Sequence, residues 1–159
     1  MNNPPIVLII ENTQRHINTI QEWLSMIDKS IKSLVRWCLV DGETMDLVTG
    51  EWLQKVFTKN KVSLVLLDAD IWTTTYQNKI IQHSWPALIE ILGINMDGIR
   101  VLPTTNGSFS NGIGDAYKKI WWDGKTIIDK SSLNYLERNI GISDGPGDRD
   151  KIRRMLEIS

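Results

Sequence analysis

The sequence predicts an α/β domain of three layers, with helices on both faces of a five-stranded, mostly parallel sheet. Continuous aliphatic runs at residues 6–10 and 62–67 are typical of strands that are buried on both faces. Segments of helical periodicity alternate with these runs along the chain. This alternation predicts parallel strands joined by right-handed crossovers, which place helices on both faces of the sheet.

Length and composition are those of one globular domain. The chain has 159 residues, of which 42% are hydrophobic and 23% charged, which argues against disorder. We expect a single domain over 1–159, with a core at about 6–140 and a C-terminal helical extension at about 146–158. No apolar run is long enough to span a bilayer, so we expect no membrane association.

Charge and cysteine content narrow the choice of partners. Eighteen Lys and Arg residues oppose nineteen Asp and Glu residues, for a formal net charge of −1, so nucleic acid is not indicated as a partner. The single cysteine, Cys38, excludes an internal disulfide and a Cys-rich zinc site. Residues 1–5 contain no basic residue of the kind that opens a signal peptide. We therefore expect a reduced, cytoplasmic protein.

The first half of the chain contains three of the expected strands. After the first strand, Asn12 or Thr13 can cap a helix of about five turns, whose apolar residues recur at spacings of three and four. These residues are Ile17, Ile20, Leu24, Ile27, Ile31 and Leu34. A second strand is expected at 35–40, a short helix at 50–58 and the third strand at 62–67.

The second half contains the remaining two strands. A polar stretch at 73–75 precedes a helix expected at about 77–92, which Pro86 interrupts or restarts and Gly93 ends. The other expected elements are a fourth strand at 99–102, a flexible loop at 104–114, a short helix at 116–122, a fifth strand at 125–128 and helices at 131–140 and 149–156.

Acidic residues follow two of the predicted strands. Glu11 follows the first strand, and Asp68 and Asp70 follow the third. In parallel α/β sheets the functional groups gather at the carboxyl ends of the strands, so these carboxylates are expected to converge in one crevice. Neighbouring carboxylates repel one another and are commonly held together by Mg²⁺, which prefers hard oxygen ligands. The simpler alternative is that each acid only caps a helix or begins a loop.

Two further strand ends can add a hydroxyl and an ammonium group. Thr104 and Thr105 follow the fourth predicted strand, and Lys130 follows the fifth. A cation, a hydroxyl and a metal ion around one carboxylate form an arrangement suited to phosphoryl groups. We therefore expect Asp68, Lys130 and one of the two threonines to form a site that handles a phosphoryl group.

The order of these residues resembles that of response-regulator receiver (CheY-like) domains. Residues 6–12, with the sequence IVLIIEN, resemble the first strand and acidic pair of that family. Residues 64–68, with the sequence LVLLD, resemble the strand that ends in its phospho-accepting aspartate. The resemblance covers most of residues 6–140 and implies a flavodoxin/CheY-like fold with strand order 2-1-3-4-5.

The resemblance also implies a chemistry for each strand end. Asp68 is the carboxylate nucleophile that accepts a phosphoryl group, and Mg²⁺ is held by Glu11, Asp68 and the backbone carbonyl of Asp70. Lys130 pairs with the phosphoryl oxygens, and the threonine after the fourth strand supplies the switch hydroxyl. Phosphorylation then changes a surface that binds a protein partner, either a kinase or a downstream effector. The protein partner can also be a second copy of this chain, which would form a homodimer.

Several departures from the family keep a second interpretation open. Asn12 stands where the family usually has a second acid, and Ser131 stands where a proline usually follows the lysine. Trp72 and three threonines lie in the loop over the site. A degenerate pseudo-receiver, which is not phosphorylated and acts only as a protein-interaction module, is therefore an alternative.

The same acids also resemble the Toprim pattern of a glutamate followed later by Asp-x-Asp. Glu11 with Asp68 and Asp70 fits that pattern, which implies a Mg²⁺-dependent enzyme acting on nucleic acid. Asn12 departs from the small residue that normally follows the Toprim glutamate, and the near-neutral charge gives no electrostatic footprint for DNA. Nucleic acid is a partner only under this alternative.

Five other side chains have plainer interpretations. His16 and His83 lack the spaced partners of a zinc site, so we expect both to be solvated surface residues. Cys38 is expected to be a small buried hydrophobe. Adjacent Trp121 and Trp122 point about 100° apart if they are helical, so one of them is expected at an interface with a protein partner.

Overall fold

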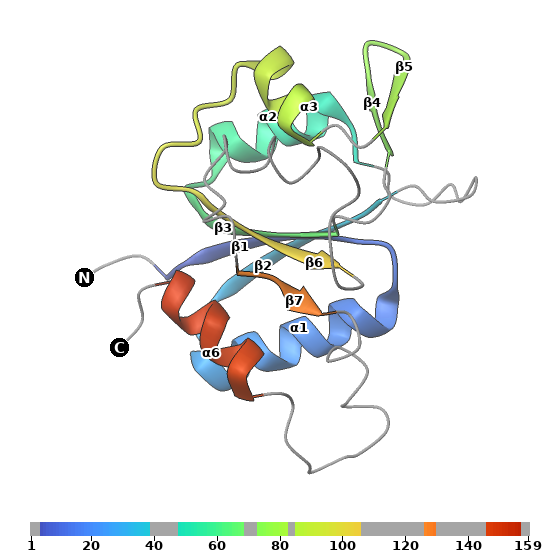
Figure 1. Cartoon of the computed structure of the whole chain (residues 1–159). Coiled ribbons are helices and arrows are strands. Elements are labelled where there is room, and N and C mark those ends of the chain that lie inside the picture. The colour runs from blue at the N-terminus through green and yellow to red at the C-terminus, as the bar shows by residue number, and fades with distance from the viewer. Residues whose placement is uncertain are drawn as a thin grey trace.

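The structure, a computed structural model, describes residues 4–38, 48–68, 73–82, 85–105, 126–129 and 146–156. The described helices are α1 (Gln14–Ile27), α2 (Gly50–Lys59), α3 (Trp85–Leu92) and α6 (Pro146–Met155). The described strands are β1 (Ile6–Glu11), β2 (Lys32–Trp37), β3 (Val62–Asp68), β4 (Thr73–Tyr76), β5 (Lys79–Gln82), β6 (Arg100–Thr105) and β7 (Ile128–Asp129). The main sheet forms the middle layer, with α2 and α3 on one side and α1 and α6 on the other (Figure 1).

The main sheet is parallel throughout its described strands. Its order is β2-β1-β3-β6-β7, and each neighbouring pair runs in the same direction. Four of these strands have six or seven residues, whereas β7 has two. The prediction of a mostly parallel sheet between helices is confirmed. The strand predicted at 125–128 is much shorter in the structure. Its place is taken by β7, of two residues, which pairs with β6.

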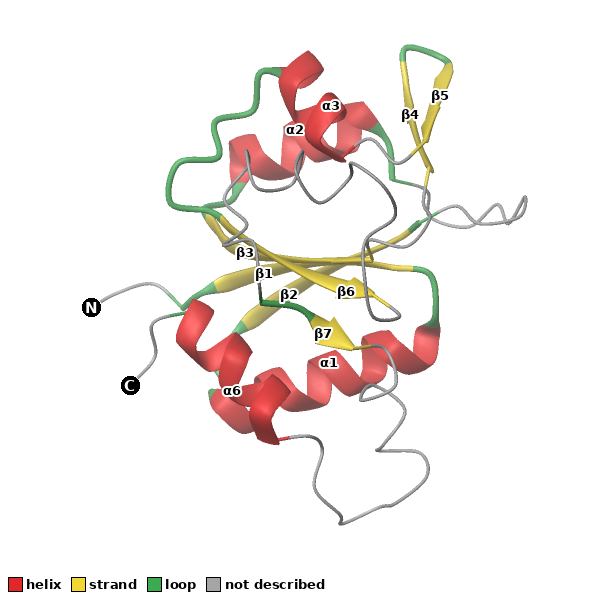
Figure 2. Ribbon diagram, viewed as in Figure 1, coloured by secondary structure: helices red, strands yellow, loops and turns green. Residues whose placement is uncertain are grey.

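The two faces of the sheet are covered by two hydrophobic cores. Successive side chains of a strand point to opposite faces. In β1, Val7 and Ile9 belong to the core under α1 and α6, whereas Leu8 and Ile10 belong to the core under α2 and α3. All four side chains are fully buried. Burial on both faces explains why the strand is an uninterrupted aliphatic run, and Figure 2 shows the helical layers responsible.

The first helix is shorter than its apolar spacing predicts, and the second strand begins earlier. α1 ends at Ile27, and Asp28 has extended backbone angles. One carboxylate oxygen of Asp28 accepts hydrogen bonds from the backbone N–H and the hydroxyl of Ser30, at 2.9 Å and 2.8 Å. Such local bonds compete with the helix and favour a turn. The helix predicted to Leu34 is therefore wrong beyond residue 27, and the strand predicted at 35–40 occupies Lys32–Trp37.

The helix predicted at 77–92 is replaced in its first part by a β-hairpin. β4 and β5 pair in antiparallel fashion around Gln77 and Asn78, both of which have positive φ angles. A two-residue turn of this kind matches the twist of paired strands, and asparagine tolerates the left-handed conformation well. The helix then begins at Trp85, with Pro86 in its first turn, as the restart at that proline predicts.

The helix after this restart ends where the glycine predicts. Gly93 has a φ of 63°, a left-handed conformation that glycine adopts without strain. The backbone N–H of Ile94 donates to the carbonyl of Ile89, and that of Gly93 donates to Glu90. These two bonds close the last turn in the manner of a glycine C-cap. The prediction that Gly93 ends this helix is confirmed.

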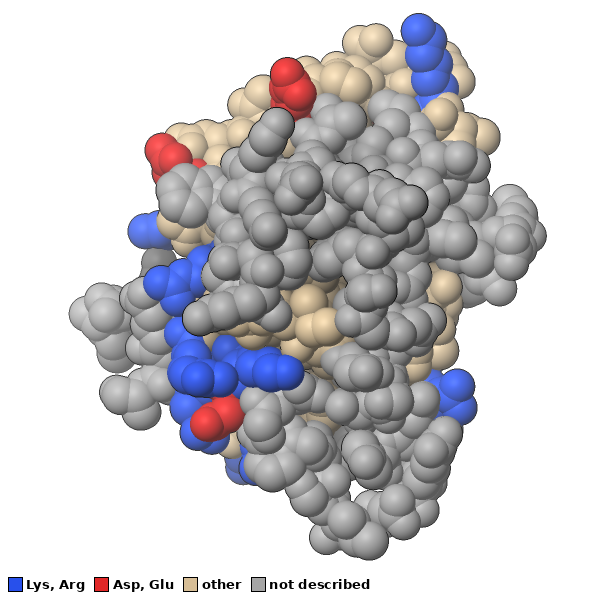
Figure 3. Space-filling view, in the orientation of Figure 1, with Lys and Arg blue, Asp and Glu red and all other residues tan. Residues whose placement is uncertain are grey.

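The remaining described elements lie close to their predicted positions. α2 covers one residue more than the predicted helix at 50–58, and β6 extends the predicted strand at 99–102 as far as Thr105. α6 begins at Pro146, three residues before the predicted start, and Lys and Arg side chains gather over it in Figure 3. The elements expected at 116–122 and 131–140 lie outside the described residues. Within the described part of the chain, no helix has the length and hydrophobicity needed to cross a membrane.

Candidate functional site

Three of the predicted site residues lie together at the carboxyl ends of neighbouring strands. Glu11 ends β1, Asp68 ends β3, and Thr104 is the last residue but one of β6. Asp68 pairs with Thr104 across β3 and β6, and the pairing of Ile10 with Leu67 places Glu11 level with Asp68. The structure therefore brings the acids of the first and third strands and a hydroxyl from β6 to the same edge of the sheet.

All three side chains are almost completely buried. The exposed fractions are 1% for Glu11, 0% for Asp68 and 1% for Thr104. A buried carboxylate is costly unless hydrogen bonds or opposite charges compensate it. The partners of these two acids therefore decide how the site is stabilised.

The carboxylate of Glu11 receives a hydrogen bond on each oxygen. The backbone N–H of Asn12 donates to Oε1 at 2.9 Å, and the hydroxyl of Thr104 donates to Oε2 at 3.1 Å. The Thr104 hydroxyl also lies 3.4 Å from the backbone carbonyl of Leu67. The contact with Glu11 is the shorter of the two. Glu11 thus holds the Thr104 hydroxyl toward the end of the neighbouring β3.

Asp68 is joined to the end of β2 through Cys38. The Cys38 thiol donates to Oδ2 of Asp68 at 3.6 Å, and the Cys38 side chain is 2% exposed. The backbone N–H of Cys38 also donates to the carbonyl of Glu11 at 3.2 Å. The prediction that Cys38 is buried is confirmed, but the residue is more than a hydrophobe because its thiol contacts the candidate nucleophile.

His16 occupies a different environment from the predicted one. The sequence predicts a solvated surface residue, but His16 lies in the first turn of α1 and is only 7% exposed. Its Nδ1 atom lies 3.6 Å from Oε1 of Glu11. The prediction is wrong because α1 begins so soon after β1 that its first turn covers the end of the same strand. His83 lies outside the described residues.

The other predicted site residues are not placed by the structure. Asp70 and Lys130 lie outside the described residues, as do Trp121 and Trp122. Thr105 is described only as part of the β6 backbone, where it pairs with Asp129. Of the two threonines, Thr104 is therefore the one whose hydroxyl is seen at the site. The roles of Asp70, Lys130 and Thr105 remain predictions.

The described residues can supply part of a magnesium site. Glu11 and Asp68 offer hard carboxylate oxygens from adjacent strand ends, which is the donor type that Mg²⁺ prefers. No group of three His, Cys, Asp or Glu side chains in the described part of the chain is arranged to hold a metal ion. Mg²⁺ usually retains several waters and binds through one or two carboxylates, so two such ligands fit this ion.

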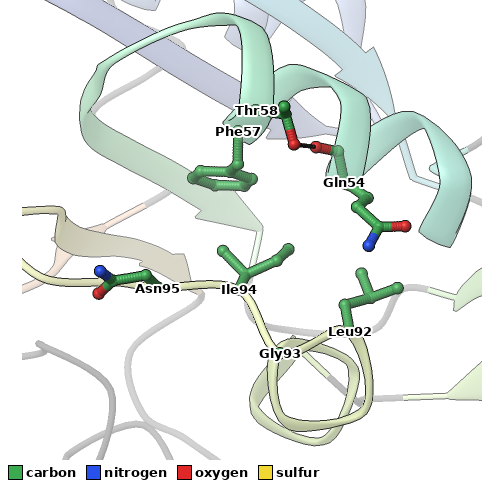
Figure 4. A pocket seen from close by; sticks show the side chains of 7 residues that line it. All are labelled: Gln54, Phe57, Thr58, Leu92, Gly93, Ile94 and Asn95. Atoms are coloured by element: carbon green, nitrogen blue, oxygen red, sulfur yellow. Dashed lines mark hydrogen bonds between the residues drawn. The ribbon is translucent and has the colours of Figure 1, made fainter.

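A separate pocket lies away from these strand ends. It has a volume of about 250 Å³ and lies between α2 and the residues that follow α3, where Phe57, Leu92 and Ile94 provide apolar walls (Figure 4). α2 ends three residues before β3 begins, so this pocket lies near the start of that strand. It does not contact the carboxylates at the other end of the sheet.

Sequence reasoning missed two members of the site, Cys38 and His16. Cys38 directly follows β2, and His16 lies five residues after Glu11. The position of Cys38 at a strand end was a usable signal, but the predicted second strand continued past it. His16 falls beside the apolar stripe of α1, and its spacing alone does not distinguish a buried polar residue from an exposed one.

Comparison with known structures identifies the fold. A response regulator receiver domain protein (CheY-like) from Methanospirillum hungatei JF-1 is similar to this chain, with a TM-score of 0.57 and 12% sequence identity. The alignment covers 97% of this chain and 94% of that chain. At this identity the similarity shows the fold alone, which is the CheY-like α/β fold that the sequence resemblance implies.

A second solved structure contains the yeast Spc42 trimeric coiled coil in a fusion. It aligns with a TM-score of 0.48 and 15% identity, over 98% of this chain and 93% of that chain. No protein-family model matches the chain, and no curated protein sequence matches it.

Proposed function

We propose that this chain is a receiver-like regulatory domain that accepts a phosphoryl group on Asp68 and acts by binding a protein partner. The observation that carries the proposal is the meeting of Glu11, Asp68 and Thr104 at three adjacent strand ends of a CheY-like fold. In parallel α/β sheets this edge is where functional groups gather. The fold supplies the placement, and the residue types supply the chemistry.

The proposed reaction begins with the Asp68 carboxylate as the nucleophile. One of its oxygens forms a bond to phosphorus, and the bond from phosphorus to the leaving group of the donor breaks, which gives an aspartyl phosphate. Glu11 and Asp68 would hold Mg²⁺, which would supply positive charge to the phosphoryl oxygens. Lys130 is proposed to pair with the same oxygens. Asp70 contributes its backbone carbonyl to the metal under this proposal.

The Thr104 hydroxyl is proposed to respond to the negative charge that a phosphoryl group adds to Asp68. It now donates to Glu11, and it lies on the residue paired with Asp68. A phosphoryl group on Asp68 offers strong acceptor oxygens nearby, so the hydroxyl exchanges one anionic acceptor for another. Movement of Thr104 displaces the end of β6, which changes the surface that a kinase or an effector contacts.

A protein-interaction module without phosphorylation is the second candidate. The observation that favours it is the burial of Asp68, which is 0% exposed and in contact with the Cys38 thiol. A phosphodonor can reach this carboxylate only if the residues over it move. Under this candidate the buried acids serve the stability of the strand ends, and partner binding does not depend on phosphate.

The test is the intact mass of the protein after incubation with Mg²⁺ and acetyl phosphate. We expect one phosphoryl group on the wild type and none on Asp68→Asn. Asp97→Asn is the matched control, because Asp97 is an exposed aspartate in the described chain and its variant should be labelled like the wild type. No adduct on the wild type, under conditions that label a known receiver, would overturn the phosphorylation proposal.

A nuclease assay with Mg²⁺ or Mn²⁺ on the same sample addresses the Toprim alternative. That alternative requires loss of activity in Asp70→Ala, whereas a receiver uses only the backbone carbonyl of that residue. Lys130→Ala should have the opposite effect. It should impair phosphorylation of Asp68 if the chain is a receiver, because the receiver chemistry needs the lysine, and should leave a Toprim activity intact. Metal-dependent cleavage that Asp70→Ala abolishes would replace the proposed function by an enzyme acting on nucleic acid.

A further inference from the structure

The hairpin formed by β4 and β5 has one edge that pairs with no described strand. The two strands form a separate sheet of their own. In Figure 1 the hairpin projects from the layer of α2 and α3, and its turn is directed away from the main sheet. An unpaired strand edge presents a row of N–H and C=O groups, which is a template for a further strand. A two-stranded hairpin is only marginally stable by itself, so an added strand would stabilise it.

The register of the hairpin shows which backbone groups face the open edge. Thr75 pairs with Ile80. In antiparallel strands, pairs that bond to each other alternate with pairs whose N–H and C=O groups point outward. Thr75 points outward, because its N–H donates to the carbonyl of Val48 at 3.1 Å and it forms a parallel bridge with Thr49. Its partner Ile80, and Gln82 two residues later, therefore direct their backbone groups toward the open edge of β5.

The same strand carries an exposed apolar side chain. Ile80 is 67% exposed, which is more than the 53% of Ile91 on α3. Tyr76 packs on Gly50, so the face of the hairpin that contains Tyr76 is turned toward α2. Successive side chains of a strand alternate between faces, so Thr75 and its partner Ile80 lie on the opposite face. Ile80 thus joins an open backbone edge to an apolar side chain in solvent.

We propose that β5 pairs in antiparallel fashion with β5 of a second copy of this chain, so that two hairpins form one continuous sheet. A two-fold axis at residue 81 generates this pairing and sets Ile80 of each copy opposite Gln82 of the other. Both outward-facing residues of each copy are then bonded. The edge is therefore complementary to itself, as an interface with two-fold symmetry requires.

The side chains of β5 favour a second copy in this register. The two Ile80 residues become diagonal neighbours on one face, with Cα atoms about 7–8 Å apart, so each side chain covers the other from solvent. Lys79 is exposed at the start of β5. The two Lys79 residues lie four positions apart along the paired strands, about 13 Å, so their repulsion is largely screened. Parallel pairing of the same strands would instead bring the two lysines side by side.

The first test measures self-association of the full chain by sedimentation equilibrium, without a phosphodonor or a metal ion. We expect the mass to rise with concentration from 18.2 kDa toward twice that value. Ile80→Lys should raise the dissociation constant at least about tenfold, because the apolar contact is replaced by two like charges. Ile91→Lys is the matched control, since it makes the same change at an exposed isoleucine of α3 and should leave the dissociation constant unchanged.

Two results of this experiment would overturn the proposal. One is a wild type that stays monomeric at every concentration, which would leave the open edge to an extended segment of another protein. The other is a dimer that Ile80→Lys does not weaken, which would place the interface elsewhere on the chain. Because Ile80 is exposed, its replacement by lysine should not impair folding of the monomer.

The second test locates the interface in the wild type by amide hydrogen exchange. The amides of Ile80 and Gln82 should exchange more slowly as the protein concentration is raised through the dissociation constant. Slowing confined to β2, which is the edge strand of the main sheet, would place the contact there and overturn the proposal. Both tests use unphosphorylated protein, so failure of Asp68 to accept phosphate would leave their expected results unchanged.

Discussion

Glu11 and Thr104 are joined by a hydrogen bond of 3.1 Å although their strands are not neighbours in the sheet. β3 lies between β1 and β6, so the two backbones are about 10 Å apart at the usual strand spacing. The glutamate side chain crosses this gap over the end of β3, where Asp68 lies. The bond thus ties together the strand ends on both sides of the candidate nucleophile.

Thr104→Val tests how much the hydrogen bond between Thr104 and Glu11 contributes to the stability of the fold. Valine has the shape of threonine without the hydroxyl, so the change removes the hydrogen bond that Thr104 donates to the buried Glu11 carboxylate. We expect a loss of about 1.5–3 kcal/mol in the free energy of unfolding, measured by urea denaturation. Thr19→Val removes a buried hydroxyl that bonds a neutral helix carbonyl and should cost less, about 0.5–1.5 kcal/mol. Equal stabilities of Thr104→Val and the wild type would contradict this account of Glu11.

Gly50→Ala tests the contact between α2 and the hairpin. Gly50 is buried at the start of α2, and a Cβ atom there would overlap the ring of Tyr76, with Cγ at 2.9 Å and Cβ at 3.0 Å. The ring must move, so we expect a loss of about 1–3 kcal/mol in the free energy of unfolding. In a Tyr76→Ala background the same change should cost much less, which a double-mutant cycle measures. An equal cost in both backgrounds would place the strain elsewhere.

The strand ends could be predicted because strands buried on both faces are continuous aliphatic runs, which are easily recognised in a sequence. Residues 6–10 and 62–67 are continuous aliphatic runs, and each is closed by an acid. Parallel strands bring their carboxyl ends to one edge, so the proximity of Glu11 and Asp68 follows from topology alone. The same reasoning indicated Thr104 and Thr105 as candidate hydroxyls, and only the structure shows which of them contacts Glu11.

The errors arise where a local interaction overrides the apolar spacing. Ile31 and Leu34 continue the spacing of α1, but the Asp28 carboxylate binds Ser30 and ends the helix. Gln77 and Asn78 turn the chain with positive φ angles, although neither is glycine. A helical period does not reveal either event, because both depend on side-chain and backbone geometry within three or four residues.

Side-chain contacts that form only when the chain folds are a second feature that the sequence does not predict. His16 and Cys38 each contact a strand-end acid, but no spacing marks them for that role. The position of His16 depends on how closely α1 packs against the end of β1. That of Cys38 depends on where β2 ends, which the predicted strand at 35–40 placed too late. Both residues therefore required the structure.

The turn after α1 gives a prediction for the acid range of pH. The backbone N–H of Ser30, and then its hydroxyl, hold the pKa of Asp28 below its ordinary value of 3.8, because both hydrogen bonds favour the carboxylate. A depressed pKa in the folded state contributes stability that is fully present above pH 3.8 and is lost as the pH falls through the folded pKa. Ser30→Ala removes the hydroxyl bond and keeps the backbone bond. We therefore expect the pKa of Asp28 to move part of the way back toward 3.8, as followed by the ¹³C shift of its carboxyl group.

The stability difference between Ser30→Ala and the wild type should disappear below the folded pKa, because the carboxyl is then protonated in both proteins. Ser25→Ala removes an exposed hydroxyl that donates to the Glu22 carbonyl and should leave the Asp28 titration unchanged. An Asp28 titration that is identical in Ser30→Ala and the wild type would show that the hydroxyl bond does not form in solution.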